Sequence, residues 1–281
     1  AVANEGGIGL IAASGMSNDE LRYEIRLARS LTSGVIGINI MVAAKKFSEI
    51  VKTAISEGID LVVAGAGFSR DMFGLGKESG TPIVPIVSSV KLAKISQRLG
   101  AAAIVVEGKE AGGHLGTDTS VRDLIADVSA AVKVPVIAAG GILHGQDIVD
   151  MIKMGAAGVQ MGSRFAACEE SNAAPALKEY YLKSKPEDIV VIHSPVGLPG
   201  RAVHTPFSAR VLEGPVPPKQ CDACLKACQH NFCIIRALTR AQQGDVETGL
   251  VFSGNNMRKV NEILPVKEIF ARLQQEVSQI D

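Results

Sequence analysis

One glycine-rich segment of this sequence carries a histidine that could do chemistry. The run Glu107-Gly-Lys-Glu-Ala-Gly-Gly-His114 follows an apolar stretch and ends on the imidazole. A neutral imidazole in such a loop can act as a general base, or it can polarise a carbonyl or nitro group. His114 is therefore predicted to be the catalytic residue, although a lone loop histidine more commonly bonds to the backbone. Glu107 and Glu110 could orient it, line the same pocket, or be solvated loop carboxylates.

Two short glycine motifs are predicted to bind a phosphate group. Gly140-Gly141 and Gly162-Ser163 follow two successive apolar runs of the chain. Glycines let backbone N–H groups approach an anion, and the loops after the last two strands of a (β/α)₈ barrel commonly do this. Either motif alone is weak, because a strand-to-helix turn favours glycine anyway. Their occurrence one unit apart makes the prediction stronger.

Two further positions are predicted to contact a flat ring. Asn39 interrupts an apolar run at its C-terminal end, and a buried amide needs hydrogen-bonding partners. A flavin ring offers such donors and acceptors, whereas the simpler alternative is an asparagine that forms a turn. Gly65-Ala-Gly67 would let a planar group approach the backbone closely.

Four of the five cysteines gather in one short segment. Cys221, Cys224, Cys228 and Cys233 have a spacing led by Cys-x-x-Cys, which suits a tetrahedral Zn²⁺ site or an iron–sulfur cluster. The alternative is a set of reduced thiols, with two of them on one helix face. Cys168 stands apart and is expected to be a packed thiol. This pattern argues against an extracellular disulfide framework and favours the cytoplasm.

The elements that must position these residues form a repeat of strands and helices. Seven continuous apolar runs predict strands buried on both faces, at Gly9–Ala13, Val35–Met41, Leu61–Ala64, Ile83–Val87, Ala103–Val106, Val134–Ala139 and Gly158–Met161. Stretches with helical spacing lie between them, at Asp19–Leu31, Phe47–Ile55, Leu92–Leu99, Val121–Val132 and Ile148–Met154. Alternation of this kind predicts a parallel sheet.

The count of repeat units favours a TIM-type (β/α)₈ barrel that lacks one strand. Residues 1–7 resemble the end of a helix with its glycine cap, so the first strand is expected to precede Ala1. A seven-stranded open barrel is the alternative. Residues 1–167 are predicted to form the barrel core. Residues 168–281 are predicted to be an insertion and helical tail packed on it, with helices at 172–183, 233–243 and 266–279, a strand at 189–192 and a loop at 195–200.

Composition narrows the class of partner. The 281 residues are 47% hydrophobic and 21% charged, with 29 basic and 29 acidic residues, which excludes a disordered chain. The balanced charge and the 4% aromatic content predict binding of neither nucleic acid nor a membrane surface. No apolar run is long enough for a membrane span, and no signal peptide is evident. A small-molecule substrate and a cytoplasmic location are expected, and association as a homodimer is left open.

Three motifs carry a resemblance to a known family. Glu107–His114, Ala139-Gly-Gly-Ile142 and Met161-Gly-Ser-Arg-Phe165 closely resemble the nitronate monooxygenase family, which also contains the flavin-dependent enoyl-acyl-carrier-protein reductases. The resemblance covers roughly residues 1–205. The glutamate-rich loop looks more like the reductase branch, and the tail after Pro195 matches neither well-characterised branch.

The resemblance implies a barrel that binds FMN without a covalent bond. It implies that Gly140, Gly141, Gly162 and Ser163 hold the FMN phosphate. It also implies that Asn39 contacts the isoalloxazine ring and that His114 is the catalytic histidine. Gly65, Glu107 and Gly113 complete the predicted set of cofactor contacts.

The activity that the resemblance implies is FMN-dependent oxidation of alkyl nitronates to a carbonyl compound and nitrite. An alternative is an NAD(P)H-dependent flavin reductase of enoyl thioesters or quinones. A third alternative, of another class, is a flavin-binding electron-transfer or sensor protein in which the cysteine segment acts as a relay or a partner surface.

Overall fold

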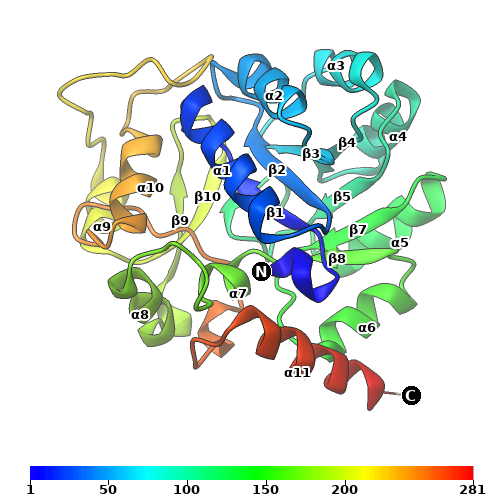
Figure 1. The fold of residues 1–281 in the computed structure, drawn as a ribbon. Helices are drawn as coiled ribbons and strands as arrows, with labels where there is room; N and C mark the ends of the chain where they lie inside the picture. Colours follow the sequence, from blue (N-terminus) through cyan, green and yellow to red (C-terminus); the bar gives the residue numbers. More distant parts are fainter. Residues whose placement is uncertain (281) are drawn as a thin grey trace.

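A curled parallel sheet with helices along its outer face forms the centre of the molecule (Figure 1). The computed structural model describes residues 1–280. The strands lie in the order β1-β2-β3-β4-β5-β7-β8, and each neighbouring pair is parallel. They are β1 (Gly9–Ala12), β2 (Ile36–Met41), β3 (Leu61–Gly65), β4 (Ile83–Val87), β5 (Ile104–Glu107), β7 (Val136–Ala139) and β8 (Gly158–Gln160). This order is consistent with the predicted TIM-like barrel.

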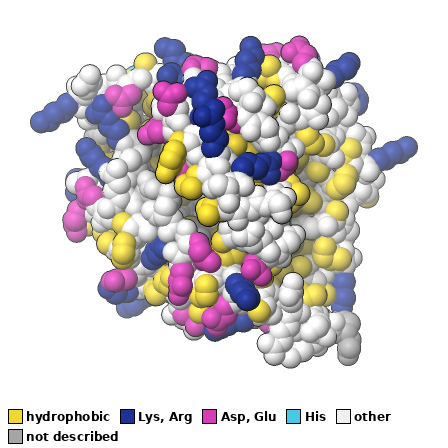
Figure 2. Space-filling model, in the orientation of Figure 1, with side chains coloured by type: hydrophobic (Ala, Val, Ile, Leu, Met, Phe, Trp, Pro, Cys, Tyr) yellow, Lys and Arg dark blue, Asp and Glu magenta, His cyan; other side chains and the backbone are white. Residues whose placement is uncertain are grey.

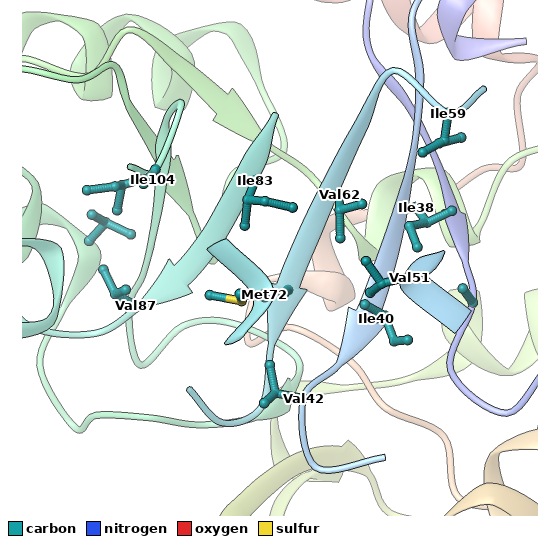
Figure 3. Packing of buried hydrophobic residues seen from close by; sticks show 14 of the residues in the cluster. Ile38, Ile40, Val42, Val51, Ile59, Val62, Met72, Ile83, Val87 and Ile104 are labelled. Atoms are coloured by element: carbon teal, nitrogen blue, oxygen red, sulfur yellow. The ribbon is translucent and has the colours of Figure 1, made fainter. Parts of the chain in front are cut away.

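Burial of both faces explains why these strands are continuously apolar. Figure 3 shows Ile38, Val62 and Ile83 side by side on neighbouring strands, where they pack against the outer helices. The next residue of β3, Val63, belongs instead to a separate cluster with Val84 of β4 and Val105 of β5. Successive side chains of a strand point to opposite faces, so each strand needs apolar residues at every position.

Five helices cover the outer face as the helical spacing predicts, and a sixth was not predicted. They are α1 (Asn18–Leu31), α2 (Phe47–Ser56), α3 (Asp71–Ser79), α4 (Val90–Leu99), α5 (Val121–Ala131) and α6 (Gly145–Lys153). The unpredicted helix is α3, whose internal Gly74 and Gly76 weaken the helical signal. A Cβ atom at Gly76 would lie 2.3 Å from Cγ1 of Ile83, so glycine there permits the close packing of α3 on β4.

The two edges of the sheet are β1 and β8, which are not paired with each other within residues 1–280. A strand that would close the barrel between them stays a prediction. The expected helix end with its glycine cap is the single 3₁₀ turn η1 (Val2–Glu5), followed by Gly6 at φ 83°.

The C-terminal part of the chain adds a small antiparallel sheet and further helices. The sheet has the order β6-β10-β9, from β6 (Gly113–His114), β9 (Ile189–His193) and β10 (Pro199–Val203). The helices are α7 (Ser163–Ala166), α8 (Pro175–Lys183), α9 (Pro206–Glu213), α10 (Ile234–Gln242) and α11 (Val266–Ser278), with the 3₁₀ turns η2 (Pro186–Asp188) and η3 (Met257–Lys259). Helix α11 packs on α6.

Two predictions for this part are wrong in detail. Pro199 and Gly200 were assigned to a loop, but they begin β10, because Gly200 pairs with both Ile192 and His114. Helix α9 was not predicted at all. It begins at Pro206, after an N-cap threonine whose side chain accepts a hydrogen bond from Ser208.

Acidic and basic side chains are interspersed with hydrophobic ones on the face drawn in Figure 2, without a large area of one sign. Within the described residues, no helix combines the length and the apolar character that crossing a membrane requires.

Candidate active site

A cavity of about 460 Å³ lies at the C-terminal ends of the barrel strands. Its volume falls within the range of about 300–1,000 Å³ that is typical of small-molecule sites. Parallel strands bring their C-terminal ends to one edge, so residues far apart in sequence meet there. The lining contains all nine residues predicted as catalytic or cofactor contacts: Asn39, Gly65, Glu107, Gly113, His114, Gly140, Gly141, Gly162 and Ser163.

His114 is held by a residue from the C-terminal part of the chain. Its Nε2 lies 2.7 Å from Oγ of Ser194, and Ser194 is fully buried. The edge of its ring faces Phe252, with ring centroids 5.2 Å apart and an interplanar angle of 78°. Together, these two contacts fix the orientation of the imidazole ring. Within residues 1–280, Nδ1 has no hydrogen-bond partner, so it is the nitrogen available to a ligand in the cavity.

Two titratable groups of the cavity have strongly shifted pKa values. Burial lowers the pKa of His114 to about 4, so the imidazole is neutral at physiological pH. Burial also raises the pKa of Glu107 to about 7. No hydrogen bond compensates the carboxyl group of Glu107 within the described chain, so it exchanges its proton near neutral pH. A neutral base and a carboxyl group of this kind are typical of functional sites.

Glu110 does not orient His114, which corrects one of the three roles considered for it. Its Oε2 accepts a hydrogen bond of 3.1 Å from the backbone N–H of Val121, at the start of α5. A carboxylate at this position satisfies a free helical N–H and interacts favourably with the helix dipole. Glu110 therefore anchors the loop before His114, and Ser194 is the residue that contacts the imidazole.

The glycine motifs form a cradle with free backbone donors. Gly140 and Gly141 have φ values of 111° and 72°, which side chains rarely tolerate. A Cβ atom at Gly141 would also lie 2.9 Å from Cβ of Glu110. Within residues 1–280, the N–H groups of Gly141, Ile142 and Gly162 donate to no protein acceptor. Unpaired backbone N–H groups that line a cavity fit an anionic oxygen ligand such as a phosphate.

The side chains of Asn39 and Gln160 line another part of the cavity, and both lack a hydrogen-bond partner in the described residues. Asn39 lies in the C-terminal half of β2, and Gln160 is the last residue of β8. Polar groups left unpaired in a partly buried cavity indicate a ligand that carries complementary donors and acceptors. The predicted FMN, with a phosphate at the cradle and a polar ring edge, satisfies both features.

The C-terminal part of the chain closes the cavity, and sequence reasoning missed this wall. Asn256 donates from Nδ2 to the carbonyl oxygen of Gly141 at 2.6 Å, and the N–H of Gly254 donates to Oγ of Ser163 at 2.9 Å. Ile235 and Leu238 of α10 also line the cavity. The small polar run Ser253-Gly-Asn-Asn256 was a usable signal, because such a run resembles the other glycine loops of the site.

The cysteine segment lies beside the cavity rather than in it. None of its four cysteines is in a disulfide bond. Within the described residues, no group of three or more His, Cys, Asp or Glu side chains is arranged to hold a metal ion. No preformed ligand set exists, and metal binding stays a prediction. The fifth cysteine, Cys168, is buried against Val266 and Ile269, which confirms the expected packed thiol.

The fold and the cavity define a class, α/β proteins with a curled parallel sheet that is consistent with a TIM-like barrel and has its ligand cavity at the C-terminal ends of the strands. Within that class, the chain belongs to the nitronate monooxygenase family, whose model matches residues 1–276. This match confirms the resemblance that the three sequence motifs carry.

Three relatives illustrate the range of the family. A (3aS,4S,5R,7aS)-5-hydroxy-7a-methyl-1-oxo-octahydro-1H-indene-4-carboxyl-CoA dehydrogenase of Mycobacterium tuberculosis is 32% identical over 216 residues, which cover 76% of this chain and 61% of that protein. A probable nitronate monooxygenase of Staphylococcus aureus is 28% identical over 263 residues, which cover 77% of this chain and 74% of that protein. The structure of FabK from Thermotoga maritima has a TM-score of 0.86 and 33% identity, covering 99% of this chain and 87% of that one. The chain thus spans 61% and 57% of the dehydrogenases of M. tuberculosis and Rhodococcus jostii.

Proposed function

We propose that this chain binds FMN and uses O₂ as the oxidant and oxygen source to convert alkyl nitronates to a carbonyl compound and nitrite. The observation that carries the proposal is the presence of a neutral histidine and a cradle of free N–H groups in the same cavity. Family membership and the name of the Staphylococcus aureus relative support it. When bound, FMN would supply the electron-transfer chemistry of the reaction.

Each part of the cavity would have a distinct task in holding the cofactor. The N–H groups of Gly141 and Gly162 would bind the phosphate, with the hydroxyl group of Ser163 beside them. The amide of Asn39 would hydrogen-bond to the polar edge of the ring, and Gly65 and Gly113 would let the flat ring approach the backbone. The loop at Asn256 would hold the cradle in place through its bond to Gly141.

His114 would remove the α-proton when the substrate is a neutral nitroalkane. For Nδ1 to accept that proton, Nε2 must carry a hydrogen and donate it to Oγ of Ser194. Burial keeps the imidazole in the neutral, proton-accepting form at physiological pH. A preformed nitronate has already lost this proton, so it needs His114 only for binding.

A second candidate function is reduction of an enoyl thioester or quinone with NAD(P)H as co-substrate. One observation favours it: the Mycobacterium tuberculosis relative is named for a carboxyl-CoA substrate. In this reaction His114 would lie near the carbonyl group of the substrate and hydrogen-bond to it.

Anaerobic mixing of the FMN-loaded protein separates the two functions. A nitronate such as ethylnitronate should bleach the flavin absorbance, and NADH or NADPH should not. If NADH or NADPH bleaches the flavin quickly and the nitronate does not, the first function is refuted and the second is supported. Absence of bleaching with any of them would contradict both and favour a flavin-binding protein without this chemistry.

Ser194→Ala is expected to lower kcat/KM for a neutral nitroalkane by about 2–10-fold, the effect of one hydrogen bond. The imidazole would lose the partner that fixes its tautomer, whereas the FMN cradle would be unchanged. Steady-state kinetics and flavin content measure the two effects. Ser96→Ala is the matched control, since Ser96 is equally buried but its hydroxyl group has no hydrogen-bond partner among residues 1–280 and does not line the cavity. Equal losses in both variants would contradict the positioning role.

Glu107→Gln is expected to stabilise the apoprotein at high pH only. The pKa of Glu107 is raised from 4.5 to about 7, so the unfolded chain releases a proton between these values that the folded chain retains. This penalty is small below pH 4.5, grows as the pH rises, and is fully present above pH 7. Glutamine does not ionise and therefore removes this penalty. The expected gain in the free energy of unfolding is about 3 kcal/mol at pH 8 and under about 1 kcal/mol at pH 5.

Urea unfolding at the two pH values measures this difference. The same substitution at the exposed Glu78 is the control and should show no such pH dependence. A gain from Glu107→Gln that is equal at both pH values would refute a raised pKa for this carboxyl group.

A further inference from the structure

One wall of the candidate cavity is apolar, and segments far apart in the sequence form it. Met41 is the last residue of β2, and Ala66 directly follows β3. Ile235 and Leu238 lie three residues apart on α10, and Phe252 comes from the segment after that helix. These five residues, the apolar wall, belong to one hydrophobic cluster or pack against it. All but Met41 are only partly buried, so a ligand in the cavity can cover more of their surface.

The apolar wall is tied to His114 through the backbone. The N–H of Leu250 donates to the carbonyl oxygen of Ala237, in the middle of α10, at 2.9 Å. Two residues after Leu250, the ring of Phe252 contacts the imidazole of His114 in a T-shaped arrangement, with centroids 5.2 Å apart. Helix α10 and the imidazole therefore keep a fixed relation to each other, as a substrate that contacts both of them requires.

The strand order places the apolar wall across the cavity from the glycine cradle. The cradle follows β7 and β8, whereas Met41 and Ala66 lie at the ends of β2 and β3, with β4 and β5 between the two pairs. The curled sheet brings these two pairs of strand ends to face each other (Figure 1). Asn39 points to the same side of β2 as Met41, and Gly65 directly precedes Ala66. A ring held at Asn39 and Gly65 would therefore lie beside the apolar wall.

The cavity offers no cation to a substrate. Within residues 1–280, its lining contains no lysine or arginine, and its titratable side chains are Glu107, His114 and Tyr181. His114 is neutral at physiological pH because burial lowers its pKa to about 4. Burial raises the pKa of Tyr181 to about 12, and its hydroxyl group donates to the carbonyl oxygen of Phe252 at 2.8 Å. A carboxylate on the far end of a substrate would thus be buried without a partner, which is costly.

We propose that the apolar wall receives the hydrocarbon group of the substrate and makes the chain selective for nitroalkanes and nitronates with an uncharged alkyl chain of several carbons. Small substrates and substrates that carry a second charge are disfavoured. This inference rests on the proposed function, because the nitro end of the substrate must lie at His114. Ile235 and Leu238 are the specificity-determining residues, since they contact neither the cradle nor His114. Each methylene group that the wall takes out of water should strengthen binding about fourfold.

Straight-chain carboxylates test the wall without turnover, because a carboxylate has the charge and the planar two-oxygen end of a nitronate. Calorimetric titration of the FMN-loaded chain should give a Kd that falls about fourfold per methylene from butyrate to hexanoate. In Ile235→Ala/Leu238→Ala this dependence should fall below about twofold. Ile55→Ala/Leu124→Ala is the matched control, because both residues are partly buried outside the cavity. Equal Kd values for the two carboxylates in the unaltered chain, or the same chain-length dependence in both double variants, would overturn the proposal.

A pair of nitroalkanes with nearly the same shape tests the selection against charge. In 4-nitrobutyrate a carboxylate replaces the isopropyl group of 1-nitro-4-methylpentane. The unaltered chain should prefer the uncharged compound by more than about 100-fold in kcat/KM. Leu238→Lys should reduce this ratio at least about tenfold, since the ammonium group can pair with the carboxylate. Leu212→Lys, at an exposed leucine of α9, is the matched control and should leave the ratio unchanged.

The outcomes separate this inference from the proposed function. Turnover of both nitroalkanes with similar kcat/KM, or an unchanged ratio in Leu238→Lys, would overturn the inference and leave the proposed function intact. Turnover of neither compound, together with a chain-length dependence of carboxylate binding that Ile235→Ala/Leu238→Ala removes, would refute the proposed function. The apolar wall would then be supported as the binding site for the hydrocarbon group of a different substrate.

Discussion

Replacing His114 with alanine is expected to lower turnover of a neutral nitroalkane by about 10²–10⁴-fold, the usual contribution of a general base. The physical reason is the loss of the imidazole that, alone among residues 1–280, lines the cavity and whose Nδ1 has no partner there and would accept the α-proton. FMN content should be unchanged, because the cradle of N–H groups lies on other loops. Steady-state kinetics with the nitroalkane, together with the flavin absorbance of the purified variant, measures both effects.

A preformed nitronate provides the internal control for this variant. Its proton has already gone, so the loss of turnover should be much smaller than for the nitroalkane. His144→Ala is the control for loss of an imidazole as such, since His144 is exposed at the start of α6 and does not line the cavity. A loss under roughly tenfold in His114→Ala would make His114 a packing residue. Equal losses with both substrates would refute proton removal as its task.

Replacing Gly141 with aspartate is expected to weaken FMN binding by more than about 100-fold, because placing like charges together costs several kcal/mol. The new carboxylate would repel the phosphate. The new Cβ atom would also lie 2.9 Å from Cβ of Glu110, in a backbone conformation with φ at 72°. Quenching of flavin fluorescence on titration measures the affinity. Riboflavin, which lacks the phosphate, should lose much less affinity than FMN.

Gly74→Asp is the matched control for this substitution. Gly74 is exposed on α3, and a Cβ atom there would meet nothing within 4 Å. This variant should keep the FMN affinity of the unaltered chain. Retention of stoichiometric FMN by Gly141→Asp would contradict the phosphate assignment. An equal loss of FMN and riboflavin affinity would show that the effect is a general distortion of the cavity.

Most of the barrel could be predicted because each strand is buried on both faces. A run such as Ile83–Val87 has no polar residue, which indicates a buried strand. The segments between the runs have apolar residues at helical spacing. The alternation of strands and helices can therefore be predicted from these two local patterns. Helix α3 was not predicted because Gly74 and Gly76 both weaken the local helical signal, and only Gly76 is explained by close packing, which is a tertiary requirement. Strand β10 was not predicted because it begins with a proline and a glycine, which locally indicate a loop.

The residues of the candidate site could be predicted only where they follow an apolar strand in the sequence. The glycine loops directly follow strands of the parallel sheet, and His114 lies in the loop region that begins where β5 ends, so the parallel sheet brings these segments to one edge. Ser194 lies 80 residues from His114 in the sequence and contacts it through the pairing of β6 with β10. No local pattern encodes that pairing. For the same reason, Glu110 looked like a partner of the nearby histidine, although it caps α5 instead.

A crystal structure of this chain with FMN tests the central claim most directly. The account predicts that the phosphate lies within hydrogen-bonding distance of the N–H groups of Gly141 and Gly162, and that the ring edge meets the amide of Asn39. Nδ1 of His114 should face the ring across the space left for substrate. FMN bound outside the cavity at the C-terminal ends of the strands, or bound there with its phosphate away from Gly141 and Gly162, would contradict the account.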